Sequence, residues 1–271
     1  MKPIITATEL SAILARRDLR VFDVRWYLAD PRAGRTEYGD AHIPGAVFVD
    51  LETDLSGNDG PGRHPLPTPR AFTETLRRLG LDKEHHVVVY DASAGATAAR
   101  MWWMLRSAGH AGVQVLDGGL VAWRAAGHPT TTAVPVVRRG HFPSITAWSG
   151  IADASAVADR TGPLIDARAA DRYRGEHEPI DPAAGHIPGA INLPFVDNLA
   201  QDSQQFDPSA ISQRFVGMDD AIVYCGSGVT ACHNLLAMEL AGVTGGLLYE
   251  GSWSDWSADP GRPVATGPEP G

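Results

Sequence analysis

Cys225 stands where a cysteine can act as a nucleophile. It directly follows an apolar run at residues 221–224, and residues 232–240 read as a helix. The loop that it opens consists of Gly226, Ser227, Gly228, Val229 and Thr230. The two glycines let successive backbone amides turn inward, and with the helix N-terminus these amides form a cradle for an anion. Such a cradle favours the thiolate, which is the nucleophilic form of cysteine.

The alternative for a lone cysteine is a small buried hydrophobic residue, which is its commoner use. We assign that structural role to Cys232, which lacks the strand-end position and the glycine loop. With only two cysteines, the chain has no disulfide framework and too few thiols for a structural zinc site. We expect no metal.

Four short blocks recur in the same order in the two halves of the chain. The matched pairs are residues 21–25 with 164–168, 41–46 with 185–190, 88–91 with 222–225, and 116–123 with 249–256. A repeat of this length indicates duplicated domains rather than a solenoid. We predict domains at residues 1–127 and 149–271, joined by a linker at residues 128–148 that is poor material for a helix.

The elements of each half alternate between short apolar strands and helices. The expected strands are residues 19–24, His86–Tyr90, Val113–Leu116, Leu164–Asp166, Ile222–Tyr224 and 246–249. Expected helices begin at a capping box formed by Thr6 and Glu9, at Thr68-Pro69, and over residues 94–108. This pattern is typical of an α/β fold with a mainly parallel sheet covered by helices on both faces. In such sheets the ligand site lies beyond the carboxyl ends of the strands, where Cys225 is found.

Composition excludes several classes of function. The 271 residues carry a formal net charge of −9, which disfavours nucleic acid as a partner. No apolar run approaches the roughly 20 residues that a membrane span needs. The first ten residues lack the apolar stretch of a secretory signal. We therefore expect a soluble, cytoplasmic protein with no membrane partner.

The loop that begins at Cys225 resembles the active-site loop of rhodanese-like sulfurtransferases. Residues 166–168, 185–190 and 250–253 resemble other signatures of that family, and the repeat extends the resemblance to nearly the whole chain. The resemblance implies two tandem rhodanese-like domains and an enzyme that carries sulfur as a persulfide on Cys225, without a cofactor. Asp91 stands at the nucleophile's place in the first copy. A carboxylate cannot accept a sulfane sulfur, so that copy is expected to be inactive.

Gly226 and Ser227 bear on the sulfur donor. They resemble the 3-mercaptopyruvate branch of the family, because the thiosulfate branch usually has Arg and Lys after the cysteine. Thiosulfate remains the alternative donor. The resemblance also implies an acceptor that is a thiol, such as thioredoxin or a small thiol, or cyanide.

Arg168 and Arg172 follow the first strand of the second half and are assigned to the substrate site. By resemblance, Arg172 contacts the anionic donor, and an arginine can bind a carboxylate through two parallel hydrogen bonds. Arg25 holds the place of Arg168 in the first copy, which favours a structural ion pair for Arg168. His42 and His186 occur in both copies of a His-Ile-Pro-Gly-Ala motif, which likewise favours a structural role.

A proton relay is implied by resemblance to the 3-mercaptopyruvate branch. It would run from Ser227 through His64 to Asp50 or Glu52. The alternative is a solvated His64 in a Pro/Gly-rich loop, since proton transfer requires hydrogen-bond contact between these groups.

Two other functions compete. A cysteine phosphatase on the same fold would need a longer loop that closes with an arginine, whereas this loop ends at Ala231. A non-catalytic binding module is the second alternative, and the presence of Cys225 weighs against it.

Overall fold

Strands and helices alternate in the same order in both halves of the chain, and the second half has one additional 3-10 helix. The computed structural model describes residues 1–271. The strands of the first half are β1 (Ile4–Ile5), β2 (Leu19–Asp23), β3 (Val47–Phe48), β4 (His86–Tyr90) and β5 (Val113–Leu116). Its helices are α1 (Ala7–Ile13), α2 (Ala33–Asp40), α3 (Pro69–Arg78), α4 (Ala98–Ser107) and α5 (Gly119–Ala125).

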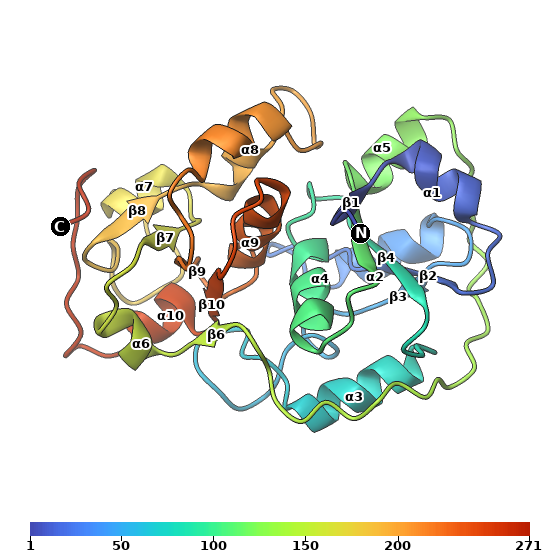
Figure 1. Ribbon diagram of the computed structural model, residues 1–271, viewed down its shortest axis with the longest axis horizontal. Coiled ribbons are helices and arrows are strands. Elements are labelled where there is room, and N and C mark those ends of the chain that lie inside the picture. Colours follow the sequence, from blue (N-terminus) through green and yellow to red (C-terminus); the bar gives the residue numbers. More distant parts are fainter. The chain divides into compact units, whose positions relative to one another are not determined.

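The second half supplies another set of strands and helices (Figure 1). Its strands are β6 (Ile151–Ala152), β7 (Leu164–Asp166), β8 (Ala190–Asn192), β9 (Ile222–Tyr224) and β10 (Leu247–Tyr249). Its helices are α6 (Ala154–Ala158), α7 (Ala170–Arg174), the 3-10 helix η1 (Phe195–Asn198), α8 (Pro208–Arg214), α9 (Ala231–Leu240) and α10 (Ser252–Trp256).

Each set of strands forms one five-stranded sheet. The strand orders are β1-β5-β4-β2-β3 and β6-β10-β9-β7-β8, and the neighbouring strands pair in parallel. The two orders are the same when each copy is counted from its own first strand. The sequence repeat is thus a repeat of topology, and the predicted α/β fold is confirmed.

Strand β4 shows why each sheet is covered on both faces. Successive side chains of a strand point to opposite faces. Val88 and Tyr90 pack in one cluster with Leu10 of α1 and Trp123 of α5. Val87 and Val89, on the other face, are also completely buried, and α4 packs against this strand. Burial on both faces explains the continuous apolar run at His86–Tyr90.

The helix starts follow the local sequence in two of three predicted cases. Thr6 and Glu9 form the predicted capping box of α1, with the Glu9 amide donating to Thr6 Oγ1 at 3.2 Å. Thr68 caps α3, which begins at Pro69 as predicted. Helix α4 begins at Ala98 rather than at residue 94. Ala94 and the following glycine have left-handed backbone conformations, so these residues belong to the loop.

Contacts divide the chain into two compact units. We call unit 1 the segments Met1–Gly57, Pro67–Ser149 and Gln201–Phe206. We call unit 2 the segments Asn58–Leu66, Gly150–Ala200 and Asp207–Gly271. Each unit therefore includes a short segment from the other half of the sequence. No helix of either unit is long and apolar enough to cross a lipid bilayer.

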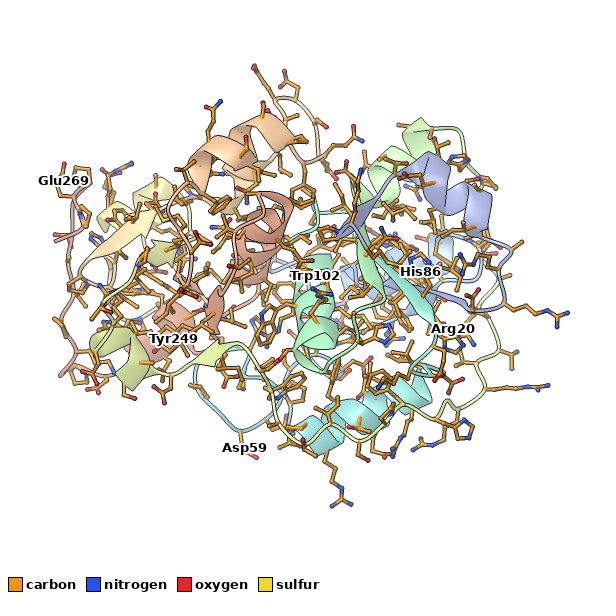
Figure 2. The ribbon with its side chains drawn as sticks, in the orientation of Figure 1. Arg20, Asp59, His86, Trp102, Tyr249 and Glu269 are labelled. Carbon is orange, nitrogen blue, oxygen red and sulfur yellow. The ribbon has the colours of Figure 1, made fainter.

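The segment Asn58–Leu66, which carries Asp59 in Figure 2, is attached to unit 2 at the first turn of α10. Gly62 has φ +76°, and a Cβ on it would lie 2.4 Å from the carbonyl oxygen of Gly251. Only glycine allows this approach. The next amide, of Arg63, donates to Ser254 Oγ at 3.1 Å. The segment is thereby held by backbone contacts, which fix where its side chains project.

Candidate active site

Cys225 lies at the carboxyl end of β9 and is 2% exposed. Its amide donates to Ser252 Oγ at 3.2 Å, and its carbonyl accepts from the Trp253 amide at 2.9 Å. Ser252 has a left-handed φ of 55°, an uncommon conformation for serine that its hydroxyl stabilises by donating to the Tyr249 carbonyl at 2.9 Å. The backbone of the candidate nucleophile is therefore fixed on both sides by hydrogen bonds to α10.

Cys232 lies in α9, behind the active-site loop. Neither cysteine is in a disulfide, and Cys232 Sγ donates to the carbonyl of Gly228 in that loop at 3.3 Å. This contact fits the structural role expected for Cys232.

The equivalent loop of unit 1 shows how such a loop treats an anion. The Asp91 carboxylate accepts hydrogen bonds at 2.9 Å from the amides of Ser93, Gly95, Thr97 and Ala98. The hydroxyl of Thr97 adds another at 3.0 Å. Four backbone amides at the start of α4 thus converge on one negative charge.

The two loops share their anchoring. The carbonyl of Asp91 accepts from the Leu120 amide at 2.8 Å, just as that of Cys225 accepts from Trp253. Each loop ends at a threonine that begins the following helix, Thr97 in unit 1 and Thr230 in unit 2. In unit 1 the anion cradle is filled by a side chain of its own loop. In unit 2 the same position carries a thiol.

Ser227 and His64 are brought together inside unit 2. The Nδ1 atom of His64 lies 2.8 Å from Ser227 Oγ, within hydrogen-bond distance. Ser227 is buried, and His64 reaches it from the segment Asn58–Leu66. This geometry supports proton exchange between the two side chains.

Asp50 and Glu52, the predicted relay acids, belong to unit 1. Asp50 Oδ1 accepts from the amides of Glu52 and Thr53 at 3.0 and 3.1 Å, so this carboxylate closes a turn. Glu52 is exposed. The acid of the relay stays a prediction.

Arg168 is held in a buried ion pair. Its guanidinium binds Asp166 at 2.6 Å and donates to the Gly185 carbonyl at 2.6 Å. Arg25 makes the same contact with Asp23 at 2.7 Å in unit 1. Because both copies contain the pair, the geometry favours the structural role of Arg168 over substrate binding.

His42 and His186 are also structural in both copies. Their Nδ1 atoms lie 2.7 and 2.8 Å from the carbonyls of Tyr38 and Tyr173, and each ring stacks on that tyrosine.

Arg172 faces the active-site loop together with an arginine that the sequence analysis missed. A Cβ on Gly226 would lie 3.3 Å from Arg172 Nη1 and 2.9 Å from Arg63 Nη2. Arg172 binds Glu178 at 2.7 Å and Asp181 at 3.1 Å, and Arg63 also pairs with Asp181. The one signal for Arg63 in the sequence is its place directly before His64.

A family model for the rhodanese-like domain matches the chain twice, at residues 6–126 and 150–259. The chain belongs to the rhodanese family. A Pseudomonas aeruginosa protein named "Probable 3-mercaptopyruvate sulfurtransferase" is 48% identical over 278 residues, covering 97% of this chain and 98% of that protein. The thiosulfate sulfurtransferase of Mus musculus is 35% identical over 252 residues, covering 88% and 84%.

Solved structures agree with this assignment. The 3-mercaptopyruvate sulfurtransferase from Leishmania major superposes with a TM-score of 0.86 at 31% identity, covering 95% of this chain and 74% of that one. The predicted family and enzyme class are confirmed: this rhodanese is a sulfurtransferase.

Proposed function

We propose that this rhodanese takes sulfur from 3-mercaptopyruvate and passes it to a thiol through a persulfide on Cys225. The observation that carries the proposal is the position of Cys225. It opens a loop whose counterpart in unit 1 binds a carboxylate with four backbone amides. A loop of this kind stabilises both a thiolate and a persulfide anion.

The proposed cycle is a double displacement. The Cys225 thiolate attacks the donor's sulfur and forms an S–S bond. The donor's C–S bond breaks, and its electron pair leaves with pyruvate as the enolate. Ser227, hydrogen-bonded to His64, protonates that enolate. An acceptor thiolate then attacks the outer sulfur of the persulfide, which releases Cys225 as the thiolate.

The donor preference follows from the charge around the loop. Gly226 and Ser227 add no charge, and the arginines that face the loop are paired with Glu178 and Asp181. A donor with one carboxylate suits this site better than doubly charged thiosulfate. Thiosulfate remains the alternative, because relatives with that name share the fold and most of the chain length.

The remaining roles are proposals of the same kind. Unit 1 does not transfer sulfur, because Asp91 fills its own cradle. The acceptor is thioredoxin, a small thiol or cyanide. We place the reaction in the cytoplasm, where thiols stay reduced. Helix α9 begins at Ala231 without an arginine in the preceding loop, which disfavours a phosphatase.

Intact mass measured after brief exposure to each donor tests this function, with Cys225→Ser as the control. We expect a gain of one sulfur from 3-mercaptopyruvate in the wild type and none in the variant. A gain from thiosulfate alone would keep the mechanism and replace the donor. If neither donor adds sulfur, the sulfurtransferase cycle is wrong for this chain, and the binding-module alternative takes its place.

A further inference from the structure

We propose that Arg63 binds the carboxylate of the sulfur donor together with Arg172, beside Gly226. The inference rests on the proposed function and adds a specificity-determining residue to it. Both arginines belong to unit 2, Arg63 through the segment Asn58–Leu66 and Arg172 through α7.

The pattern of ion pairs leaves one edge of each guanidinium for a ligand. Asp181 Oδ1 pairs with Arg63 Nη1, and its Oδ2 pairs with Arg172 Nη2 at 3.1 Å. Glu178 takes Nε and Nη2 of Arg172 at 3.2 and 2.7 Å. The atoms that face Gly226 are the other ones, Arg63 Nη2 and Arg172 Nη1.

Gly226 lets both guanidinium groups lie close to the active-site loop. Its φ lies outside the left-handed region, so the backbone conformation does not require glycine here. A Cβ would instead project toward the two guanidinium edges, 2.9 and 3.3 Å from them. The missing side chain therefore lets two cations approach the backbone of the residue next to the nucleophile.

Arg63 also carries a donor that the protein does not satisfy. Its Nε is buried and has no hydrogen-bond partner. Such orphaned donors are uncommon in native proteins, and a bound anion would supply the missing acceptor.

The local charge count favours a donor with one negative charge. Arg63, Arg168 and Arg172 lie in one network with Asp166, Glu178 and Asp181. Three positive charges face three negative ones, so the network is neutral overall, and a doubly charged ligand would add more uncompensated negative charge to it than a singly charged one.

The segment Asn58–Leu66 positions both Arg63, which would bind the carboxylate, and His64, which contacts Ser227. The Arg63 amide is bonded to Ser254 Oγ, and His64 is next in the chain, 2.8 Å from Ser227. Since Ser227 directly follows Gly226, a carboxylate held at Gly226 would place the keto group of the donor near the serine hydroxyl.

The first experiment separates charge recognition from turnover. Cys225 is alkylated with iodoacetate, which carries a carboxylate, and with neutral iodoacetamide, and the ratio of the two rates is measured. In Arg63→Gln we expect the ratio to fall about 10-fold to 100-fold, because a hydrogen bond between charged groups is lost. Arg63→Lys should recover part of the preference. Arg124→Gln, an exposed position on α5 of unit 1, is the matched control.

The second experiment uses the reaction itself. We expect kcat/KM of Arg63→Gln for 3-mercaptopyruvate to fall by a similar factor, and that for mercaptoacetone, which lacks the carboxylate, to stay near the wild-type value. Equal losses for both donors with an unchanged alkylation ratio would mean that Arg63 is only structural. Unchanged values throughout would also overturn the inference. If the wild type takes no sulfur from 3-mercaptopyruvate, the proposed function fails first, while the alkylation ratio still tests the anion site.

Discussion

Glu178 and Asp181 bind the same arginine, yet their pKa values shift in opposite directions. Burial raises the pKa of Glu178, but hydrogen bonds from Arg172 and from the amides of Ile180 and Asp181 outweigh it, so the pKa is lowered. Burial also raises the pKa of Asp181, where the charges of Arg63 and Arg172 do not offset it. The anionic form is therefore favoured by the fold at Glu178 and disfavoured at Asp181.

This difference predicts opposite pH trends for Glu178→Gln and Asp181→Asn. The stability that Glu178 contributes is present above its unfolded pKa and is lost as pH falls through its lowered folded pKa. Glu178→Gln should thus be less stable than the wild type at neutral pH, by a margin that shrinks in acid. Charged Asp181 lowers the free energy of unfolding. The stability of Asp181→Asn relative to the wild type should therefore increase as pH rises. Urea unfolding midpoints between about pH 2 and pH 7 measure both trends. Parallel trends would contradict the assignment.

Asp91 and Cys225 occupy equivalent positions, but only the Asp91 side chain accepts hydrogen bonds from the amides of its loop. In Asp91→Ala, four amides lose their acceptor, whereas the Thr97 hydroxyl keeps the Val24 carbonyl as an acceptor at 2.7 Å. We expect a loss of about 3 kcal/mol or more, since unpaired buried donors are costly. Cys225→Ala removes a side chain to which no backbone amide donates, and should cost about 1 kcal/mol. Chemical denaturation of the two variants gives the comparison, and equal losses would mean that Asp91 does not hold its loop.

At the scale of elements, the segment Asn58–Leu66 depends on one close backbone approach. Gly62→Ala would put a Cβ 2.4 Å from the Gly251 carbonyl, and would displace Arg63 and His64 together. We expect kcat/KM with 3-mercaptopyruvate to fall about 10-fold or more, because a small misplacement of positioning groups is costly in catalysis.

Gly127→Ala supplies the control for this prediction. Gly127 has the similar φ of +74°, but a Cβ there meets nothing within 4 Å. Gly127→Ala therefore imposes the same kind of backbone strain as Gly62→Ala but no steric clash with a neighbouring carbonyl. If both variants lose the same activity, the segment is not what positions the site.

The sequence predicted those elements whose cause is local. Strands His86–Tyr90 and Val113–Leu116 have the predicted bounds, because burial on both faces makes them mostly apolar, with His86 and Gln114 as the polar residues. The start of α4 was wrong by four residues. Alanine has high helix propensity, but Ala94 lies in a loop that wraps the Asp91 carboxylate, and a hydrogen-bonded charge overrides propensity there.

The candidate site was likewise predictable only where its residues belong to locally recognisable elements. Cys225 follows a recognisable strand and opens a recognisable loop, and Arg172 follows β7. Arg63 was missed because nothing in a Pro/Gly-rich stretch indicates which surface it packs on. That surface, Gly251 and Ser254, lies some two hundred residues later in the chain. Long-range backbone approach leaves little trace in a single sequence.

For the whole molecule, the exchange of segments between halves predicts coupled unfolding. Unit 2 includes Asn58–Leu66, and unit 1 includes Gln201–Phe206, where the Phe206 amide donates to Asp117 Oδ1 at 2.9 Å. Neither half of the chain can therefore unfold without releasing a piece of the other unit. We expect one cooperative transition. Tryptophan fluorescence and the alkylation of Cys232, which is completely buried in the folded protein, should report the same urea midpoint, whereas two separate midpoints would show that the units unfold independently.

The attachment of Leu66 has a consequence for synthesis on the ribosome. Its amide donates to Glu250 Oε2 at 2.9 Å across 184 residues of chain. At the usual speeds of translation, this segment emerges on the order of 10 to 40 s before its partner exists. Arg63 and His64 are present throughout that interval, whereas Cys225 is made only near its end. The catalytic site of the nascent chain can therefore be completed only after Glu250 has been translated.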